Sequence, residues 1–157
     1  MDNQIVGLFI DAAKNVFNEV GFSELSCTDG SFSAEHAEIV SSVGIVGDIQ
    51  GYLILRGDRK SVYNFVSKIL SNMGMESEGE EFGQFHKEAV GEIVNQVSGR
   101  SVMLLAERGY DCNITPPTIV MGNNIHIDMK SLESSISGDI KGPYGTIGVF
   151  AGIKKIK

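Results

Sequence analysis

The stretch EFGQFHKEAVGEIVNQVSGRSVMLLAERG, residues 81–109, decides the fold of this chain because it predicts one long helix. The helical pattern runs from about Glu80 to Arg108, and Gly109 is well placed to end it. Helical residues advance by about 100° each, so apolar side chains three and four residues apart gather on one side. That apolar stripe comprises Val90, Ile93, Val94, Val97 and Leu104. The stripe predicts packing against a core, with the opposite, polar side left at the surface.

The polar side of this helix has an unusual composition. Glu92 and Asn95 lie next to each other on it, within an arc of about 60°. Glu88 precedes them by about one turn, and Gly99 follows by about one turn. Asn and Gly are poor helix formers, and such local exceptions often mark functional sites. A solvated helix surface would also explain the pair, so spacing alone assigns it no role.

Two further helices are expected before this one. Residues 3–20 carry apolar side chains at helical spacing, and Gly21 is placed to end that helix. The second helix runs from about Arg59 to Met73, with either Asp58 or Ser61 as its N-cap.

The remaining apolar segments predict β-strands. Residues 41–58 form two strands joined between Asp48 and Gly51, where Gly51 suits a tight turn. Four later strands are expected over residues 118–122, 124–129, 131–141 and 144–155. The last two form a hairpin around Gly142-Pro143-Tyr144, whereas Pro116–Pro117 imposes an extended segment ahead of all four.

These elements predict the fold class. Helices combined with antiparallel strand pairs are typical of an α+β fold, in which helices pack over one antiparallel-rich sheet. The length of 157 residues suits one domain with a sizeable core, and no linker-like composition divides it. A single domain over residues 1–157 is therefore expected.

Composition excludes several functions. The net charge of -7 and the lack of a basic stripe argue against nucleic acid as a partner. No membrane-span pattern or signal peptide is found, so a cytoplasmic location is expected. Cys27 and Cys112 are predicted to be reduced thiols, and they share no metal-ligand spacing. His36, His86 and His126 show no such spacing either, so no metal site is predicted.

The helical segment E-I-V-N-Q-V-S-G, residues 92–99, resembles the signature of the CheC/CheX/FliY phosphatases, which is E-x-x-N followed by an apolar residue and a glycine. Glu92 and Asn95 stand at the two signature positions, and Gly99 stands at the glycine. The order of elements, including ITPPTIVMG after the long helix, is also similar to that family. Only one copy of E-x-x-N occurs, and residues 11–14 of the first helix do not match it. A single copy resembles the CheX branch.

The resemblance implies a chemotaxis enzyme that hydrolyses the aspartyl phosphate of a CheY-like response regulator in two-component signalling. Asn95 would position the attacking water, and Glu92 would pair with a lysine of the receiver. Glu88, Gln96 and Gly99 would contact the partner, and Gly99 would let the partner's backbone approach closely. The chain would need no cofactor of its own, because the receiver's carboxylates would hold the Mg²⁺. The resemblance further implies a homodimer formed through sheet edges.

Two other functions remain open at this point. A CheX-like module could bind a receiver or a flagellar-switch component without hydrolysing anything. Alternatively, the domain could be purely structural, with the polar side of the helix serving only as surface. In that last case, Asn95→Ala would leave the phosphorylation lifetime of every receiver unchanged.

Overall fold

The structure is a computed structural model that describes residues 2–21, 25–28, 37–74, 83–125, 132–142 and 145–157. Its helices are α1 (Asp2–Glu19), α2 (Arg59–Asn72) and α3 (Gln84–Glu107). Its strands are β1 (Leu25–Thr28), β2 (Ala37–Gly47), β3 (Ile49–Gly57), β4 (Cys112–Ile114), β5 (Thr118–Ile125), β6 (Ser134–Gly142) and β7 (Gly145–Ile156).

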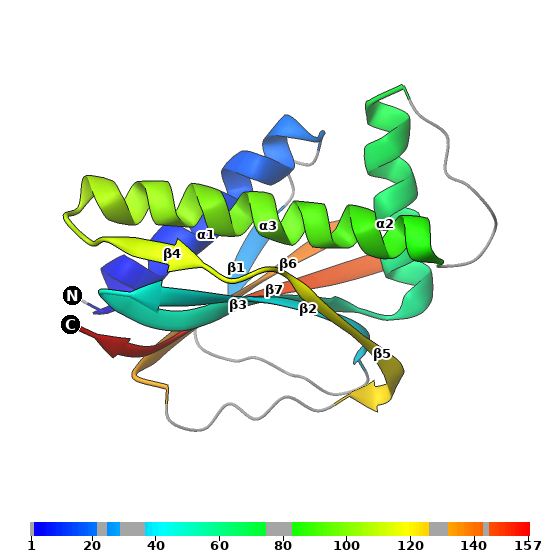
Figure 1. Cartoon of the computed structure of the whole chain (residues 1–157). Coiled ribbons are helices and arrows are strands. Elements are labelled where there is room, and N and C mark those ends of the chain that lie inside the picture. The colour runs from blue at the N-terminus through cyan, green and yellow to red at the C-terminus, as the bar shows by residue number, and fades with distance from the viewer. Residues whose placement is uncertain (1, 22–24, 29–36, 75–82, 126–131, 143–144) are drawn as a thin grey trace.

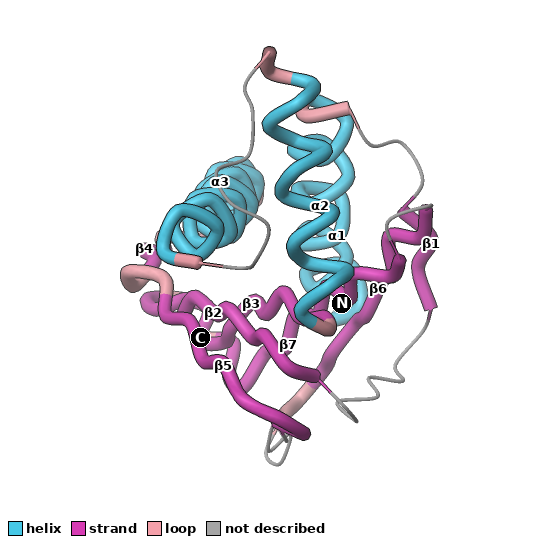
Figure 2. The backbone as a smooth tube through the Cα atoms, turned by 90° about the vertical axis from the view of Figure 1, so that its right-hand side faces the viewer, coloured by secondary structure: helices cyan, strands magenta, loops and turns pink. Residues whose placement is uncertain are grey.

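The strands form one antiparallel sheet, and the helices of the described chain cover one of its faces (Figures 1 and 2). The strand order is β1-β6-β7-β3-β2-β4, and β5 pairs with β2 beyond β4 along the same strand. The predicted α+β class, a sheet with helices packed over it, is therefore confirmed. Within the described residues, none of the helices has the length and hydrophobicity that a membrane crossing requires.

The main core lies between the helices and the sheet. Phe9 and Phe17 of α1 and Phe65 of α2 are almost fully buried there, and the rings of Phe17 and Phe65 meet edge to face with centroids 5.8 Å apart. Successive residues of a strand face opposite sides of the sheet. Leu53 therefore joins the main core, while Ile54 joins a smaller cluster of buried side chains. That cluster also contains Ala37, Val40 and Phe150. The central strands are thus buried on both faces.

The β2–β3 connection turns at Asp48, between the end of β2 and the start of β3. Gly47 supplies the left-handed backbone of this turn, with φ at +119°. The prediction that Gly51 belongs to the turn is wrong, because Gly51 lies inside β3. A Cβ added at Gly51 would collide with the carbonyl oxygen of Gly152 in β7. This glycine is thus required by the close approach of β7, which local sequence does not reveal.

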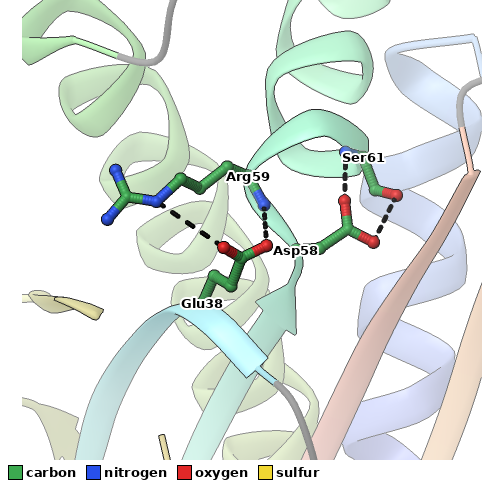
Figure 3. Close-up of polar contacts among 4 residues, drawn as sticks. All are labelled: Glu38, Asp58, Arg59 and Ser61. Carbon is green, nitrogen blue, oxygen red and sulfur yellow. Dashed lines mark hydrogen bonds and ion pairs between the residues drawn. The ribbon is translucent and has the colours of Figure 1, made fainter. Parts of the chain in front are cut away.

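Asp58 is the N-cap of α2 (Figure 3). Its carboxylate accepts hydrogen bonds from the Ser61 backbone N–H at 2.7 Å and from the Ser61 hydroxyl at 3.1 Å. Arg59 turns toward Glu38 of β2, where its backbone N–H donates to Oε1 at 3.2 Å. Of the two cap residues considered from the sequence, Asp58 therefore caps the helix and Ser61 donates to it.

The other expected boundaries agree in part. α3 begins at Gln84, and the expected start near Glu80 lies outside the described residues, as do residues 126–129 of the strand expected over 124–129. One strand, β5, continues across Asn123, where a break between two strands was predicted. β6 and β7 form the predicted hairpin and pair up to Gly142 and Gly145, with Pro143 and Tyr144 outside the described part. β1 and β4 were not predicted, since strands this short carry little pattern.

Candidate functional site

The buried side of α3 fixes which of its residues reach the surface. It consists of His86, Val90, Ile93, Val94, Val97, Ser98, Ser101 and Leu105. Leu105, and not the predicted Leu104, is fully buried at the C-terminal end of the stripe. The prediction missed Leu105 because the buried row reaches it through two polar residues, Ser98 and Ser101. The hydroxyl of Ser98 donates to the Val94 carbonyl at 2.8 Å, so it is satisfied inside the helix.

Small side chains let α1 and α3 pack closely on each other. Ala12 and Ala13 of α1 and Ser98 and Ser101 of α3 all have a relative exposure of 0%. The remaining side of α3 is consequently turned toward solvent. The predicted pair lies on that side, with Glu92 exposed and Asn95 partly exposed.

Other predicted contact residues surround the pair. Glu88 and Gln96 are exposed, and Gly99 is partly exposed. The Gln96 side-chain amide donates to Oε1 of Glu92 at 3.3 Å, a bond between exposed groups that biases the orientation of the carboxylate. Apart from the adjacent residues and the backbone of its own helix, no described atom lies within 4 Å of a Cβ added at Gly99, so packing within the chain does not require glycine there.

An open groove of about 680 Å³ runs beside the pair. One wall is the side of α3 that carries Gln84, Lys87, Glu88, Gly91, Glu92 and Asn95. The facing wall consists of Ser41, Pro116, Pro117, Thr118 and Ile119. Figure 1 shows β4 and β5 following each other beneath α3, which places the segment between them along the helix. The groove therefore joins the predicted pair to a proline segment distant in sequence.

Hydrogen bonds hold the proline segment at both ends. Ahead of Pro116–Pro117, the N–H of Thr115 donates to the carbonyl of Gly44 at 2.9 Å. The N–H of Gly44 donates in return to Oγ1 of Thr115 at 2.8 Å. Behind the prolines, the hydroxyl of Ser41 donates to the carbonyl of Thr118 at 2.9 Å. The two exposed prolines thus project from a segment anchored on β2.

His86 is a structural residue of α3. Its side chain is only 1% exposed, and its Nδ1 accepts a hydrogen bond from the Gly83 N–H at 3.1 Å. The ring packs against Tyr63 of α2 in a tilted arrangement, with centroids 4.8 Å apart. Burial lowers the pKa of His86 below its ordinary value, which favours the neutral ring that this acceptor role needs.

Among the described residues, no three His, Cys, Asp or Glu side chains are arranged to hold a metal ion. His36 and His126 lie outside those residues, as does the side chain of Cys27. Cys112 is a free, buried thiol, and burial raises its pKa. Its Sγ accepts a weak hydrogen bond from the Ile49 N–H at 3.4 Å, so the thiol is part of the β3–β4 packing.

Comparison with protein families identifies the group to which this arrangement belongs. The model of the family described as chemotaxis phosphatase CheX matches residues 39–141, which include all of α3 and the proline segment. The chain belongs to the CheX family. This membership makes it a phosphatase, a hydrolase of chemotaxis signalling.

Individual relatives agree with the CheX assignment. The CheY-P phosphatase CheX of Thermotoga maritima is 30% identical over 131 residues, which cover 81% of each chain. A chemotactic CheC-like protein from Shewanella oneidensis MR-1 has a TM-score of 0.79 at 23% identity, covering 98% of this chain and 99% of its own. A chain of the CheX-CheY-BeF3-Mg+2 complex from Borrelia burgdorferi has a TM-score of 0.76 at 24% identity, covering 96% and 97% respectively. The two solved structures have the same fold as this chain.

The facing wall of the groove is the part of the site that sequence reasoning missed. The prolines were recognised as an extended segment typical of CheX relatives, but they were not assigned to the site. Their distance in sequence from Glu92 gives no local signal. The nearest signal is Gly91, where an added Cβ would lie 3.7 Å from Cγ of Pro117, but one glycine does not identify its neighbour.

Proposed function

We propose that this CheX-family protein hydrolyses the aspartyl phosphate of a CheY-like response regulator, with Asn95 and Glu92 as the essential side chains. The observation that carries the proposal is their placement: the two residues are neighbours on the solvent side of α3, and both line the groove. The relative from Thermotoga maritima is named a CheY-P phosphatase, and the Borrelia burgdorferi structure is a complex of CheX with CheY, BeF3 and Mg²⁺. Both support a phosphorylated receiver as the substrate.

The substrate's chemistry limits what the enzyme must supply. An aspartyl phosphate is a mixed anhydride, and its leaving group is a carboxylate that departs without strong acid assistance. A water oxygen attacks phosphorus in line, and the bond between phosphorus and the carboxylate oxygen breaks. The carboxylate leaves with the electron pair, and the proton of the water passes to phosphate or solvent. Positioning that water is the slow requirement.

Asn95 is suited to position the water. Its side-chain amide offers both a donor and an acceptor, so it can fix the orientation of one water without changing its own charge. It projects from the middle of a 24-residue helix, so its backbone is rigid. We assign Asn95 to insertion into the receiver's active site, much as a glutamine amide orients water in GTPases.

Glu92 is assigned to pairing with the receiver's active-site lysine. It stands one turn before Asn95, so a salt bridge there would set the depth and direction at which Asn95 enters. The Gln96 amide, bonded to Glu92 at 3.3 Å, would help to preserve that orientation. Glu88, Gln96 and Gly99 would contribute the surrounding contacts.

Mg²⁺ is expected to arrive with the receiver. The described residues of the groove provide two carboxylates, Glu88 and Glu92, both exposed, and they lack the cluster of ligands that Mg²⁺ sites usually have. Bound by the receiver, the ion would neutralise phosphoryl charge. This chain's residues would then orient the receiver and the water.

The assay that tests the proposal follows the loss of aspartyl phosphate from a CheY-like receiver charged by a small-molecule phosphodonor. The wild type should accelerate this loss. Asn95→Ala should lower the turnover rate by about a hundredfold or more, because the water is no longer positioned, while binding stays near the wild-type level. Glu92→Ala should weaken binding by about tenfold through loss of the charge pair.

Asn18→Ala, on the exposed side of α1, is the matched control and should behave like the wild type. A wild type that binds the receiver without accelerating dephosphorylation would instead make this chain a binding module. Unchanged rates in Asn95→Ala would remove the role assigned to that residue.

A further inference from the structure

We propose that the Pro116–Pro117 segment is a second receiver-docking element, and that the groove between it and α3 takes up the loop of the receiver that carries the active-site lysine. This inference rests on the proposed function and extends it. Glu92 lines the groove, so the partner group that pairs with Glu92 must enter there. The prolines form the wall that this entering loop would meet.

The chemistry of the groove suits such an occupant. One wall carries two carboxylates, Glu88 and Glu92, against one cation, Lys87, so its net charge is negative and would attract a lysine. The facing wall offers exposed proline rings, which provide apolar contact for the backbone and stem of the same loop. A volume of about 680 Å³ accommodates several residues of an extended loop, and the open shape permits entry from solvent.

The proline wall is built more rigidly than a simple connection requires. Proline fixes φ at about −65°, so two prolines in succession remove much of the segment's freedom. The paired hydrogen bonds between Thr115 and Gly44 anchor one end, and the bond from Ser41 to Thr118 anchors the other. An exposed apolar element that is held in advance loses little conformational freedom when a partner binds.

Gly91 is the second independent feature of the groove. It lies in α3, where glycine is less favourable than alanine by about 1 kcal/mol. A Cβ added there would lie 3.7 Å from Cγ and 3.9 Å from Cβ of Pro117, which is ordinary contact. The fold therefore accepts alanine at this position, and the gap between Gly91 and Pro117 is about as wide as one methyl group. A side chain here would raise the floor of the groove, over which the receiver loop would lie.

The test combines two kinds of variant. Pro116→Ser with Pro117→Ser removes the apolar rigid wall, whereas Gly91→Ala and Gly91→Gln fill the groove from the opposite side without touching the prolines. Gly7→Ala and Gly7→Gln are the matched controls. Gly7 is also a helical glycine, in α1, and no described atom lies within 4 Å of a Cβ added there.

Three quantities are measured for each variant: the affinity for a receiver loaded with beryllofluoride and Mg²⁺, and the KM and kcat of dephosphorylation. The double proline variant should bind about five- to tenfold more weakly and show a raised KM. Its kcat should change little, because Asn95 is untouched. Gly91→Ala should lower the affinity, and Gly91→Gln should lower it further because its side chain is larger. The Gly7 variants should keep the wild-type affinity.

The readouts separate this inference from the proposed function. If the wild type dephosphorylates the receiver but the proline and Gly91 variants match it in affinity and KM, the docking role is overturned and the catalytic assignment stands. If the wild type binds without hydrolysis, the catalytic assignment fails, and a loss of affinity in the groove variants still supports docking. Thermal unfolding of each variant identifies any that fail to fold. If the double proline variant is among them, the affinity and KM of Gly91→Ala decide whether the docking role holds.

Discussion

Gly99 is a glycine that the fold of the chain does not require. It lies within α3, and nothing described lies within 4 Å of a Cβ added there. Packing inside the chain therefore gives no reason for glycine, which is less favourable than alanine in a helix by about 1 kcal/mol. Close approach of the receiver's backbone, as proposed, would supply a reason, since a methyl group would hold the two surfaces apart.

Gly99→Ala should raise the free energy of unfolding by about 0.5–1 kcal/mol, because alanine is the better helix former. The same variant should bind the receiver more weakly and dephosphorylate it more slowly. Urea unfolding and the phosphatase assay check the two effects. Gly7→Ala is the matched control and should gain similar stability without losing activity. A Gly99→Ala protein with full activity would show that this surface is not at the interface.

At the scale of one element, the first turn of α3 depends on a neutral histidine. The Nδ1 of His86 accepts from the Gly83 N–H, and protonation would replace this acceptor with a donor. Burial lowers the pKa of His86 in the folded protein. Above about pH 6.5 the ring is neutral in both the folded and unfolded states. Below that pH the unfolded chain takes up a proton first, so folding stability falls as the pH falls.

The corresponding prediction concerns the urea midpoint at pH 7 and pH 5.5. It should fall more in the wild type than in His86→Gln, whose side-chain oxygen can still accept from Gly83 without titrating. All other ionisable groups are common to the two proteins, so the difference between their pH profiles isolates His86. Parallel pH profiles would show that His86 does not link stability to pH.

The buried side of α3 could be predicted from the sequence only in part. The apolar stripe of α3 could be predicted because Val90, Ile93, Val94 and Val97 repeat at helical spacing. Its continuation through Ser98 and Ser101 could not, because a buried serine that bonds to its own helix looks polar in sequence. The role of Gly51 was also hidden, since the reason for it lies in β7. Of the site, the pair Glu92 and Asn95 could be predicted because both lie on one helix. The groove beside them could not, because it depends on a tertiary contact between α3 and the proline segment.

At the scale of the whole molecule, the sheet has an outer strand that suits self-association. In the described sheet, β5 pairs with β2 along one side, and no strand is found along its other side. Val120 of this strand is 53% exposed. An uncovered strand with apolar side chains is a common route to pairing between copies. We therefore predict that two copies pair along the outer side of β5, as the family resemblance implies.

Sedimentation equilibrium should give a mass of twice the 16.9 kDa chain at micromolar concentration. Val120→Lys should shift the distribution toward one chain, because a charged side chain at a strand edge opposes pairing. Lys14→Glu, on the exposed side of α1, controls for a change of charge elsewhere and should leave the mass unchanged. A wild type with the mass of one chain would contradict the assignment.

The anchoring of the proline segment on β2 has a consequence for the speed of encounter. Both walls of the groove have defined positions before the receiver arrives: one belongs to a helix and the other is tied to the sheet at Thr115 and Thr118. The association rate should then be set by diffusion and charge, with no slow closure step. Because the chain carries a net charge of -7, added salt should change this rate, whereas the dissociation rate should respond far less.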